Sequence, residues 1–296
     1  MAVTPNTTTT ENFNIDAKVK DFVERFNMNW DALREIMGVM RPIRKTPGTR
    51  LKSYKVEITR GGGQPAEGDE VALSQANVTE VAYKDISLTP DRMRITAQDV
   101  EKYGAPIAVR KTTEAFLNKI QGDVMDEFYG FALTGSLTGT ETDFQMAVSM
   151  AVARVKDKFK KMKLNYGNVV VFVNTLDAGR YNGTVGITTQ TLNGIEYLKN
   201  VLGAETMIIS SEIPEGTVVA IPADNIVLYY IDPADSEFKE LGLNYYTGNG
   251  ETNLIGAARE GVYGRLSGDI HILYGLTMWA EYLDAIAVLT FGGDAA

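Results

Sequence analysis

Residues 106–133 read PIAVRKTTEAFLNKIQGDVMDEFYGFAL and carry the clearest structural pattern in the chain. Their apolar side chains recur every three or four positions, which is the spacing of one stripe along an α-helix. Pro106 suits a first helical turn, where its missing N–H is not needed, and Gly135 follows the last turn as a stop signal. The apolar stripe comprises Val109, Phe116, Ile120, Val124, Phe128 and Phe131. The opposite, polar side comprises Arg110, Glu114, Asn118, Gln121 and Asp126.

The length of this predicted helix implies a second layer of structure beside it. At about 1.5 Å per residue it spans roughly 40 Å, so its apolar stripe needs a sheet or another layer along its whole length. Lys119 and Asp123 are oppositely charged and four residues apart, which predicts an ion pair on the helix surface. The pattern alone favours a core helix of a mixed α+β domain.

The composition excludes several classes of function. The chain has 296 residues, enough for one large domain or two ordinary ones. It has no cysteine, which excludes disulfides, thiolate metal sites and cysteine nucleophiles, and its one histidine, His271, excludes a zinc site built on several histidines. No apolar run approaches the length of about 18 residues that a membrane span needs, and residues 1–11 lack the basic and apolar parts of a signal peptide. We expect a soluble protein made in a cytoplasm.

The formal net charge of −9 argues against a phosphate-binding surface. Proteins that bind nucleic acid through phosphates cluster lysine and arginine on one face. The cationic clusters here are short: Arg41, Arg44 and Lys45 form one, and five lysines within 156–163 form the other. We interpret the first as a solvated connection and the second as a helix end, where cations suit the dipole.

The N-terminal segment predicts an arm followed by helices. Residues 1–14 are polar, with four consecutive threonines, and are typical of a flexible arm. Residues 15–40 carry two apolar stripes and predict two helices with a break at 27–29, where Asn29 or Asp31 caps the second. Helices placed outside the main domain need some other surface to cover them.

Two alternating segments predict a long β-hairpin. Residues 51–58 and 78–88 have the character of strands, and the intervening 59–69, TRGGGQPAEGD, contain four glycines and a proline, which favours a flexible tip. An isolated two-stranded ribbon is marginal in water. The hairpin therefore needs a partner surface, and the rest of the chain offers no obvious one.

The middle of the chain predicts a compact α/β unit over residues 140–230. Residues 168–173, NVVVFV, are too apolar to be half exposed and predict a buried central strand. Helices are predicted at 96–103, 143–163 and 194–202, and short strands at 207–209, 218–221 and 226–231. The last third predicts strands at 238–246 and 261–266 around a turn at 247–253, then strands at 270–282 and 285–291.

A search for chemistry finds no enzyme signature. Gly61–Gly63 lack the lysine and serine or threonine of a nucleotide loop, and no helix follows them. His271 lies in an alternating apolar strand, where a packed or surface histidine is far commoner than a catalytic one. The carboxylates of Asp123, Asp126 and Glu127 indicate a solvated helix face. Sheet packing explains Tyr245, Tyr246, Tyr263 and Tyr274 better than stacking on bases. We predict no catalytic residue, cofactor or metal site.

The order of the parts resembles a known family where single motifs do not. A polar arm and a Gly-tipped hairpin precede ITAQDVEKYG (95–104) and the long helix ending in FALTG (131–135). NVVVFVNTLDAGRY (168–181), ISSEIPEGTVVAIPADNIVLYYID (209–232) and GDIHILYGLTMWAEYLDAIAVLTF (268–291) follow. Over nearly its whole length the chain resembles the major capsid proteins of tailed bacteriophages, which have the Hong Kong 97-type fold.

The resemblance implies an α+β chain divided in a particular way. Residues 1–49 would be an N-terminal arm and 50–85 an extended β-hairpin loop lying over an adjacent subunit. Residues 86–135 and 232–280 would form a peripheral domain whose spine helix is 106–133, and 136–231 with 281–296 an axial α/β domain. The resemblance also makes the hairpin tip a subunit interface, formed by Arg60, Gly61, Gly62, Gly63, Gln64, Glu67 and Asp69.

The implied function is structural. The chain would be a major capsid (head) protein of a tailed double-stranded DNA phage, self-assembling as pentamers and hexamers into an icosahedral shell. Its partners would be other copies, a separate scaffolding protein, a portal, and packaged DNA enclosed without sequence-specific binding. It would assemble in the bacterial cytoplasm and reside in the virion, with no membrane contact. Two alternatives remain: an encapsulin-like shell around protein cargo, and a small-molecule α/β enzyme or binding module.

Overall fold

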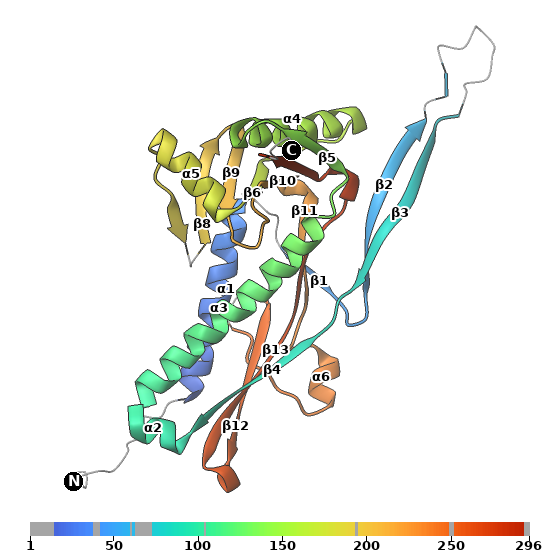
Figure 1. Ribbon diagram of the computed structural model, residues 1–296. Helices are drawn as coiled ribbons and strands as arrows, with labels where there is room; N and C mark the ends of the chain where they lie inside the picture. The colour runs from blue at the N-terminus through green and yellow to red at the C-terminus, as the bar shows by residue number, and fades with distance from the viewer. Residues whose placement is uncertain are drawn as a thin grey trace.

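The protein is a mixed α+β structure built from three sheets (Figure 1). The computed structural model describes residues 15–37, 42–59, 61–62, 73–103, 105–192, 195–248 and 252–292. A seven-stranded sheet and a five-stranded sheet lie on either side of a short junction, and a two-stranded hairpin extends away from both.

The seven-stranded sheet holds the most deeply buried part of the chain. Its strands, in spatial order, are β5 (Leu137–Glu141), β14 (Ala287–Phe291), β10 (Thr217–Pro222), β6 (Val169–Val173), β9 (Ala204–Ile209), β8 (Ile195–Val201) and β7 (Gln190–Leu192). Strand β6 is central and buried at all five positions, which confirms the prediction for NVVVFV. Val170 and Phe172 face one core cluster, while Val169, Val171 and Val173 face another. Because both faces are covered, the strand reads as a continuous apolar run.

Helices cover the two faces of this sheet. Helix α4 (Phe144–Met162) lies on one face, with Asp143 capping its N-terminus by accepting the N–H of Met146 at 2.9 Å, so this helix is confirmed as predicted. Helix α5 (Thr175–Val185) packs on the same cluster through Ala178 and was not predicted. Its Gly179 and Gly183 are weak helix formers, and the cap by Asn174 with this tertiary contact decides its structure.

The long helix α3 (Ala105–Ala132) lies against the other face, where Phe128 and Tyr129 meet the ring of Phe172 edge-on at 5.6 and 5.5 Å. Its bounds confirm the prediction for 106–133 to within one residue. Gln121 does not point outward as predicted, because it is only 6% exposed. Leu117, Gln121 and Met125 form a second buried row four residues apart, so this helix has a wider buried face than one stripe. The side chains of this helix before Ala115 are not described, so the predictions for Val109, Arg110 and Glu114 remain predictions.

The N-terminal helix α1 (Ile15–Met37) is one continuous helix, so the predicted break at 27–29 is wrong. Its buried residues keep a spacing of three or four through the supposed break: they are Val19, Phe22, Val23, Phe26, Trp30, Leu33 and Met37. The Nδ2 group of Asn27 donates to the carbonyl of Thr247 at 3.4 Å, which gives this residue a role inside the helix. The stripe packs into the core that β12 and α3 also form, so this helix is covered by its own chain.

The five-stranded sheet is organised by β13 (Ser267–Ala280), the longest strand. The first half of β13 pairs with both β4 (Thr89–Thr96) and β12 (Ile255–Val262), and its second half pairs with β11 (Ile226–Ile231). Strand β1 (Ile43–Lys45) adds in parallel to β11. The predicted α/β unit 140–230 is therefore too long, because β11 belongs to this second sheet.

Two predicted elements are wrong in type. Residues 195–201 form strand β8, not a helix, because Ile195 and Tyr197 face one core cluster while Leu198 and Val201 face the other. Residues 238–246 are not a strand: helix α6 (Ser236–Glu240), capped by Asp235, comes first, and Leu241 beyond it is 75% exposed. The hairpin in this region instead joins β12 to β13. Strands β4 and β5 were not predicted.

The two large sheets meet at a junction held by Asn225, which is 1% exposed. A single turn of 3-10 helix, Ala223–Asn225, links β10 to β11, and residues 281–286 link β13 back to β14. The side chain of Asn225 joins these two links: Nδ2 donates to the carbonyl of Tyr282 at 2.9 Å, and Oδ1 accepts the Tyr282 N–H at 2.8 Å. The chain thus crosses between the sheets twice at one place.

The hairpin formed by β2 (Arg50–Thr59) and β3 (Gln75–Asp85) was predicted correctly. Its base packs on the body, where Leu51 contacts a small cluster containing Ile86, Tyr229, Ile231 and Trp279. Ser53 is fully buried and its hydroxyl donates to the carbonyl of Ala280 at 2.5 Å. Beyond this base the ribbon runs away from the sheets (Figure 1), and the short helix α2 (Ala97–Tyr103), also predicted, lies at the opposite end of the molecule.

Candidate subunit-contact surface

The distal half of the hairpin is the least covered regular structure in the described chain. Residues 75–80 of β3 are all exposed, and the side chains of Leu73 and Val78 are 94% and 57% exposed. Cross-strand ion pairs join Arg50 to Asp85 at 3.0 Å and Lys52 to Glu80 at 2.8 Å. Such exposed pairs stabilise little, and the described side chains of the distal ribbon form no core.

The predicted interface residues fall at the tip of this hairpin, where the structure describes only Gly61 and Gly62. The N–H of Gly61 donates to the hydroxyl of Ser74 at 3.3 Å across the ribbon. A Cβ atom added to Gly62 would meet no atom within 4 Å. Arg60, Gly63, Gln64, Glu67 and Asp69 lie outside the described residues, so their role stays a prediction.

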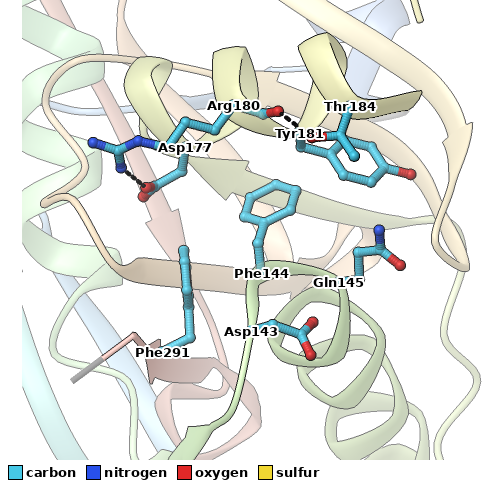
Figure 2. A pocket seen from close by; sticks show the side chains of 8 residues that line it. All are labelled: Asp143, Phe144, Gln145, Asp177, Arg180, Tyr181, Thr184 and Phe291. Atoms are coloured by element: carbon cyan, nitrogen blue, oxygen red, sulfur yellow. Dashed lines mark hydrogen bonds and ion pairs between the residues drawn. The ribbon is translucent and has the colours of Figure 1, made fainter. Parts of the chain in front are cut away.

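A groove of about 390 Å³ opens between the start of α4, helix α5 and the end of β14 (Figure 2). Its floor is aromatic, since the ring of Phe144 lies 5.2 Å from that of Tyr181 and 5.6 Å from that of Phe291. At one end the exposed guanidinium of Arg180 pairs with Asp177 at 3.1 Å and with Glu215 at 2.5 Å. Asp177 is buried and also accepts the N–H of Gly216 at 2.8 Å, so its charge is fully partnered and structural.

A second, larger cavity of about 640 Å³ lies between α3, strand β8 and the loop after β9. Helix α3 contributes Gln121, Met125, Asp126 and Tyr129, and the loop contributes Ser210, Ser211 and Glu212. Asp126 is exposed, but partial desolvation, followed by the charge of Glu212, raises the pKa of its carboxyl group. Burial raises the pKa of the Tyr129 phenol. We call this the acidic cavity. The sequence pattern missed it because Gln121 was assigned to the exposed side of the helix.

Asp269 on β13 is a carboxylate whose side chain is fully covered and which two arginines bind. Arg94 binds it with two nitrogens, each at 2.8 Å, and Arg92 forms a further ion pair with it. The hydrogen bonds from Arg94, supported by those from Arg92, hold the pKa of Asp269 far below its usual range. Arg92 and Arg94 alternate with buried Met93 and Ile95, as expected for a β-strand. This alternation could have predicted strand β4 from the sequence.

The other sequence candidates have structural roles. His271 pairs with Glu260 of β12 across the sheet, with 3.0 Å between Nε2 and Oε2, in agreement with a surface histidine. Asp123, Asp126 and Glu127 are all exposed, as predicted, and Asp123 forms the expected pair with Lys119 at 3.2 Å. In the lysine cluster of α4, Lys158 pairs with Asp284 at 2.7 Å and Lys161 with Asp157 at 2.6 Å. Arg44 lies in β1 and pairs with Asp235 at 2.9 Å.

Two further properties of the described residues bear on function. None of the described helices is long and apolar enough to cross a membrane. Within the same residues, no group of three or more histidine or acidic side chains is placed to hold a metal ion. The described surface features are the projecting hairpin, the aromatic groove and the acidic cavity.

Comparison with known proteins identifies the fold. No protein-family model matches the sequence, and no curated protein matches it. Among solved structures, the capsid asymmetric unit of cyanophage A-1(L) is similar with a TM-score of 0.53 at 9% identity, over 86% of this chain and 90% of the other. The virus-like particle from Pyrococcus furiosus is similar with a TM-score of 0.52 at 13% identity, over 92% of this chain and 98% of the other. A chain from Mycobacterium phage Patience gives 0.52 at 11%, over 98% and 91%.

These likenesses run along nearly the whole chain, which is what a shared fold requires. They confirm the expectation of a mixed α+β chain with the Hong Kong 97-type capsid fold. At identities of 9–13% the likeness is one of fold.

Proposed function

We propose that this chain is the major capsid protein of a tailed double-stranded DNA bacteriophage, a structural subunit that assembles as pentamers and hexamers into an icosahedral shell. The observation that carries the proposal is the match of 86% of this chain to 90% of a phage capsid chain at a TM-score of 0.53. The projecting hairpin supports it, because a long exposed ribbon on a single subunit is stabilised when other copies cover it.

The three sheets are the basis for assigning the domains of the subunit. The seven-stranded sheet is assigned to the axial domain, the five-stranded sheet with the spine helix α3 to the peripheral domain, and β2–β3 to the extended loop. Sheet topology supports a boundary after β10, near residue 222, in place of residue 231. Residues 1–49 are assigned to the N-terminal arm, of which α1 is anchored on its own subunit.

Partners and location belong to the same proposal. The net charge of −9 fits a shell wall that encloses DNA without gripping it, since repulsion between the wall and phosphates leaves the packaged DNA free to move. A separate scaffolding protein and a portal would take part in assembly in the host cytoplasm, and the mature subunit would reside in the virion. The chain would have no enzymatic role.

Deletion of residues 61–68 tests this function at the hairpin tip. The variant is expected to remain folded, with circular dichroism and thermal unfolding close to the parent chain, and to lose the ability to form shells in sedimentation and negative-stain electron microscopy. A matched control exchanges exposed Leu241 in the α6 turn for Ser, which alters an exposed surface away from the hairpin. Loss of secondary structure in the deletion variant, or shells as abundant as those of the parent, would contradict an intersubunit role for this loop.

The parent chain itself separates the three functional classes. Closed shells or rings of five or six support a shell protein, and enclosed DNA then distinguishes a virion from an encapsulin-like compartment with protein cargo. Particles no larger than a small oligomer, with and without the neighbouring gene products, would favour the enzyme or binding module.

A further inference from the structure

The aromatic groove, whose floor is formed by Phe144, Tyr181 and Phe291, is an apolar hollow on the seven-stranded half of the subunit (Figure 2). Its volume is about 390 Å³, and all three rings of its floor are only partly buried. Met146 and Leu176 directly adjoin lining residues in the sequence and are 47% and 58% exposed. Apolar surface that gathers in one place marks a site of contact with another molecule.

The charged groups at the groove already have partners in their own chain. The carboxylate of Asp143 accepts the N–H of Met146 at 2.9 Å. The guanidinium of Arg180 pairs with Asp177 at 3.1 Å, and its backbone carbonyl accepts the hydroxyl of Thr184 at 2.9 Å. What the groove offers to another molecule is therefore apolar contact, so the occupant that it fits is an apolar side chain.

The hairpin presents such a side chain, Leu73. It is 94% exposed, more than any other large apolar side chain that the structure describes. The neighbouring Ser74 accepts the N–H of Gly61 at 3.3 Å, which ties the backbone beside Leu73 to the opposite side of the ribbon. The base of the ribbon is anchored at Ser53, beside a shift of the strand register. From Tyr54 to Thr59 the strand extends for roughly 20 Å at about 3.3 Å per residue, so Leu73 is held well away from its own body.

The groove and the hairpin lie on opposite sides of the subunit (Figure 1). Helix α5, which forms one wall of the groove, lies at the left of the view, and β2 and β3 project at the right. A contact between two different surfaces of identical copies is heterologous, and it generates a ring when the rotation closes. Two other exposed apolar side chains, Tyr263 and Leu266, lie in the turn between β12 and β13, at the opposite end of the molecule from α5. The placement therefore favours Leu73 as the occupant.

We infer that, in the assembled shell, Leu73 of one copy inserts into the aromatic groove of the adjacent copy and packs against Phe144 and Tyr181 there. The inference rests on the proposed function and adds to it the surface that receives the hairpin. Each copy then gives one leucine and receives one, so the same contact repeats around a pentamer or a hexamer.

Cross-linking of assembled particles tests this contact, because the chain contains no cysteine and engineered thiols are therefore unambiguous. The double variant Leu73→Cys/Thr184→Cys places one thiol on the hairpin and one at the exposed rim of the groove. After treatment with a short bismaleimide, denaturing gels should show a ladder of covalent oligomers. The matched control Leu73→Cys/Leu241→Cys moves the second thiol to the turn after α6, where Leu241 is 75% exposed, and should give no ladder.

The outcomes of this experiment separate the contact from the proposed function. Particles that carry the ladder support both. Particles without the ladder, or with equal ladders in the two double variants, would overturn the contact and leave the shell function standing. A parent chain that forms no particles, with or without the neighbouring gene products, would overturn the proposed function and this contact with it.

Light scattering during assembly is a second measurement, and it needs no thiol. Leu73→Ser is expected to slow assembly at least about tenfold, because it removes the buried leucine from the contact. The midpoint of thermal unfolding of the subunit should stay unchanged, since the side chain is 94% exposed there. Leu241→Ser also replaces a highly exposed leucine and should assemble like the parent. Equal rates for Leu73→Ser and the parent, or equal losses in the two variants, would overturn the contact.

A double-mutant cycle joins the two surfaces. Thr184→Asp places a charge at the rim of the groove and should slow assembly as Leu73→Ser does. Adding Leu73→Ser to Thr184→Asp should cause little further loss, because both changes remove the same contact. Losses that multiply fully would show that the two residues act in separate contacts and would overturn the inference.

Discussion

The seven-stranded sheet and the two-stranded hairpin form the same backbone hydrogen bonds but differ in what covers them. Strand β6 is buried at every position between two layers of helices, whereas residues 75–80 of β3 are exposed at every position. Backbone pairing between strands adds little net stability in water, while burial of apolar area adds much. The sheet therefore has a core within the subunit, whereas residues 75–80 of the hairpin are covered by nothing that the structure describes.

The largest expected effect tests the sheet side of this comparison. Phe172→Ala removes a fully buried ring that packs edge-on against Phe128 and Tyr129. The free energy of unfolding should fall by about 3–5 kcal/mol, the range for deleting a buried aromatic side chain. Urea unfolding of the subunit, followed by tryptophan fluorescence, measures the change. A loss below about 1 kcal/mol would mean that the two-sided cover of β6 is not what stabilises the sheet.

A buried ion pair in the five-stranded sheet, set against an exposed pair in the hairpin, extends the comparison to pH. Because Arg94 and Arg92 hold the folded pKa of Asp269 well below the unfolded value of about 3.9, its contribution to stability is present above that pH and is lost as pH falls below it. Asp269→Asn should therefore lower stability at pH 7 and flatten its decline between about pH 5 and pH 2. Asp85→Asn at the exposed hairpin pair is the control, with a smaller effect at pH 7. Equal pH profiles for Asp269→Asn and the parent would contradict the assignment.

A smaller effect is expected where the hairpin meets the body. Ser53 is fully buried, and its hydroxyl donates to the carbonyl of Ala280 at 2.5 Å. Ser53→Ala removes that donor, leaves the carbonyl without this hydrogen bond and should cost about 1 kcal/mol. Thermal unfolding measures the loss, and hydrogen exchange should show faster exchange in residues 50–53 than in β6. If the variant matched the parent in both measurements, the base of the hairpin would be as loosely held as its distal half.

The smallest effect belongs to the distal hairpin. Val78→Ala shortens a side chain that is 57% exposed, so the stability of the isolated subunit should change by less than about 0.5 kcal/mol. Assembly should respond more than stability does, because the proposed partner surface lies on another copy. Light scattering during assembly compares the variant with the parent. A stability loss above about 1 kcal/mol would place a partner for Val78 within its own subunit.

The sequence correctly predicted those elements in which a simple apolar periodicity follows directly from burial. The long helix, the α4 helix, the hairpin and β6 were all found because their apolar periodicity matches a single buried face or two equally buried faces. The same reasoning failed for strand β8, whose apolar side chains pack into two different core clusters. In β8, Ile195, Leu198 and Val201 have helical spacing, but pairing with β7 and β9 makes the segment a strand.

The features of the candidate surfaces were harder to predict, for two physical reasons. The acidic cavity depends on Gln121 being buried by contacts from distant β8 and β9, which helix periodicity does not contain. The region before β12 depends on close backbone approach: a Cβ atom at Gly256 would lie 2.6 Å from Pro233 and 2.8 Å from Tyr245. Such contacts join residues that are far apart in the sequence, so a local sequence pattern cannot predict them.

The junction at Asn225 has a mechanical consequence. Two strand-to-strand links run side by side there, and one buried amide fastens them with bonds of 2.9 and 2.8 Å to Tyr282. A single link would act as a swivel, but two links fastened together resist twisting, so a force on one sheet passes to the other as shear across the joint. Under the proposed function, internal pressure on the shell wall would pass from one sheet to the other through this joint.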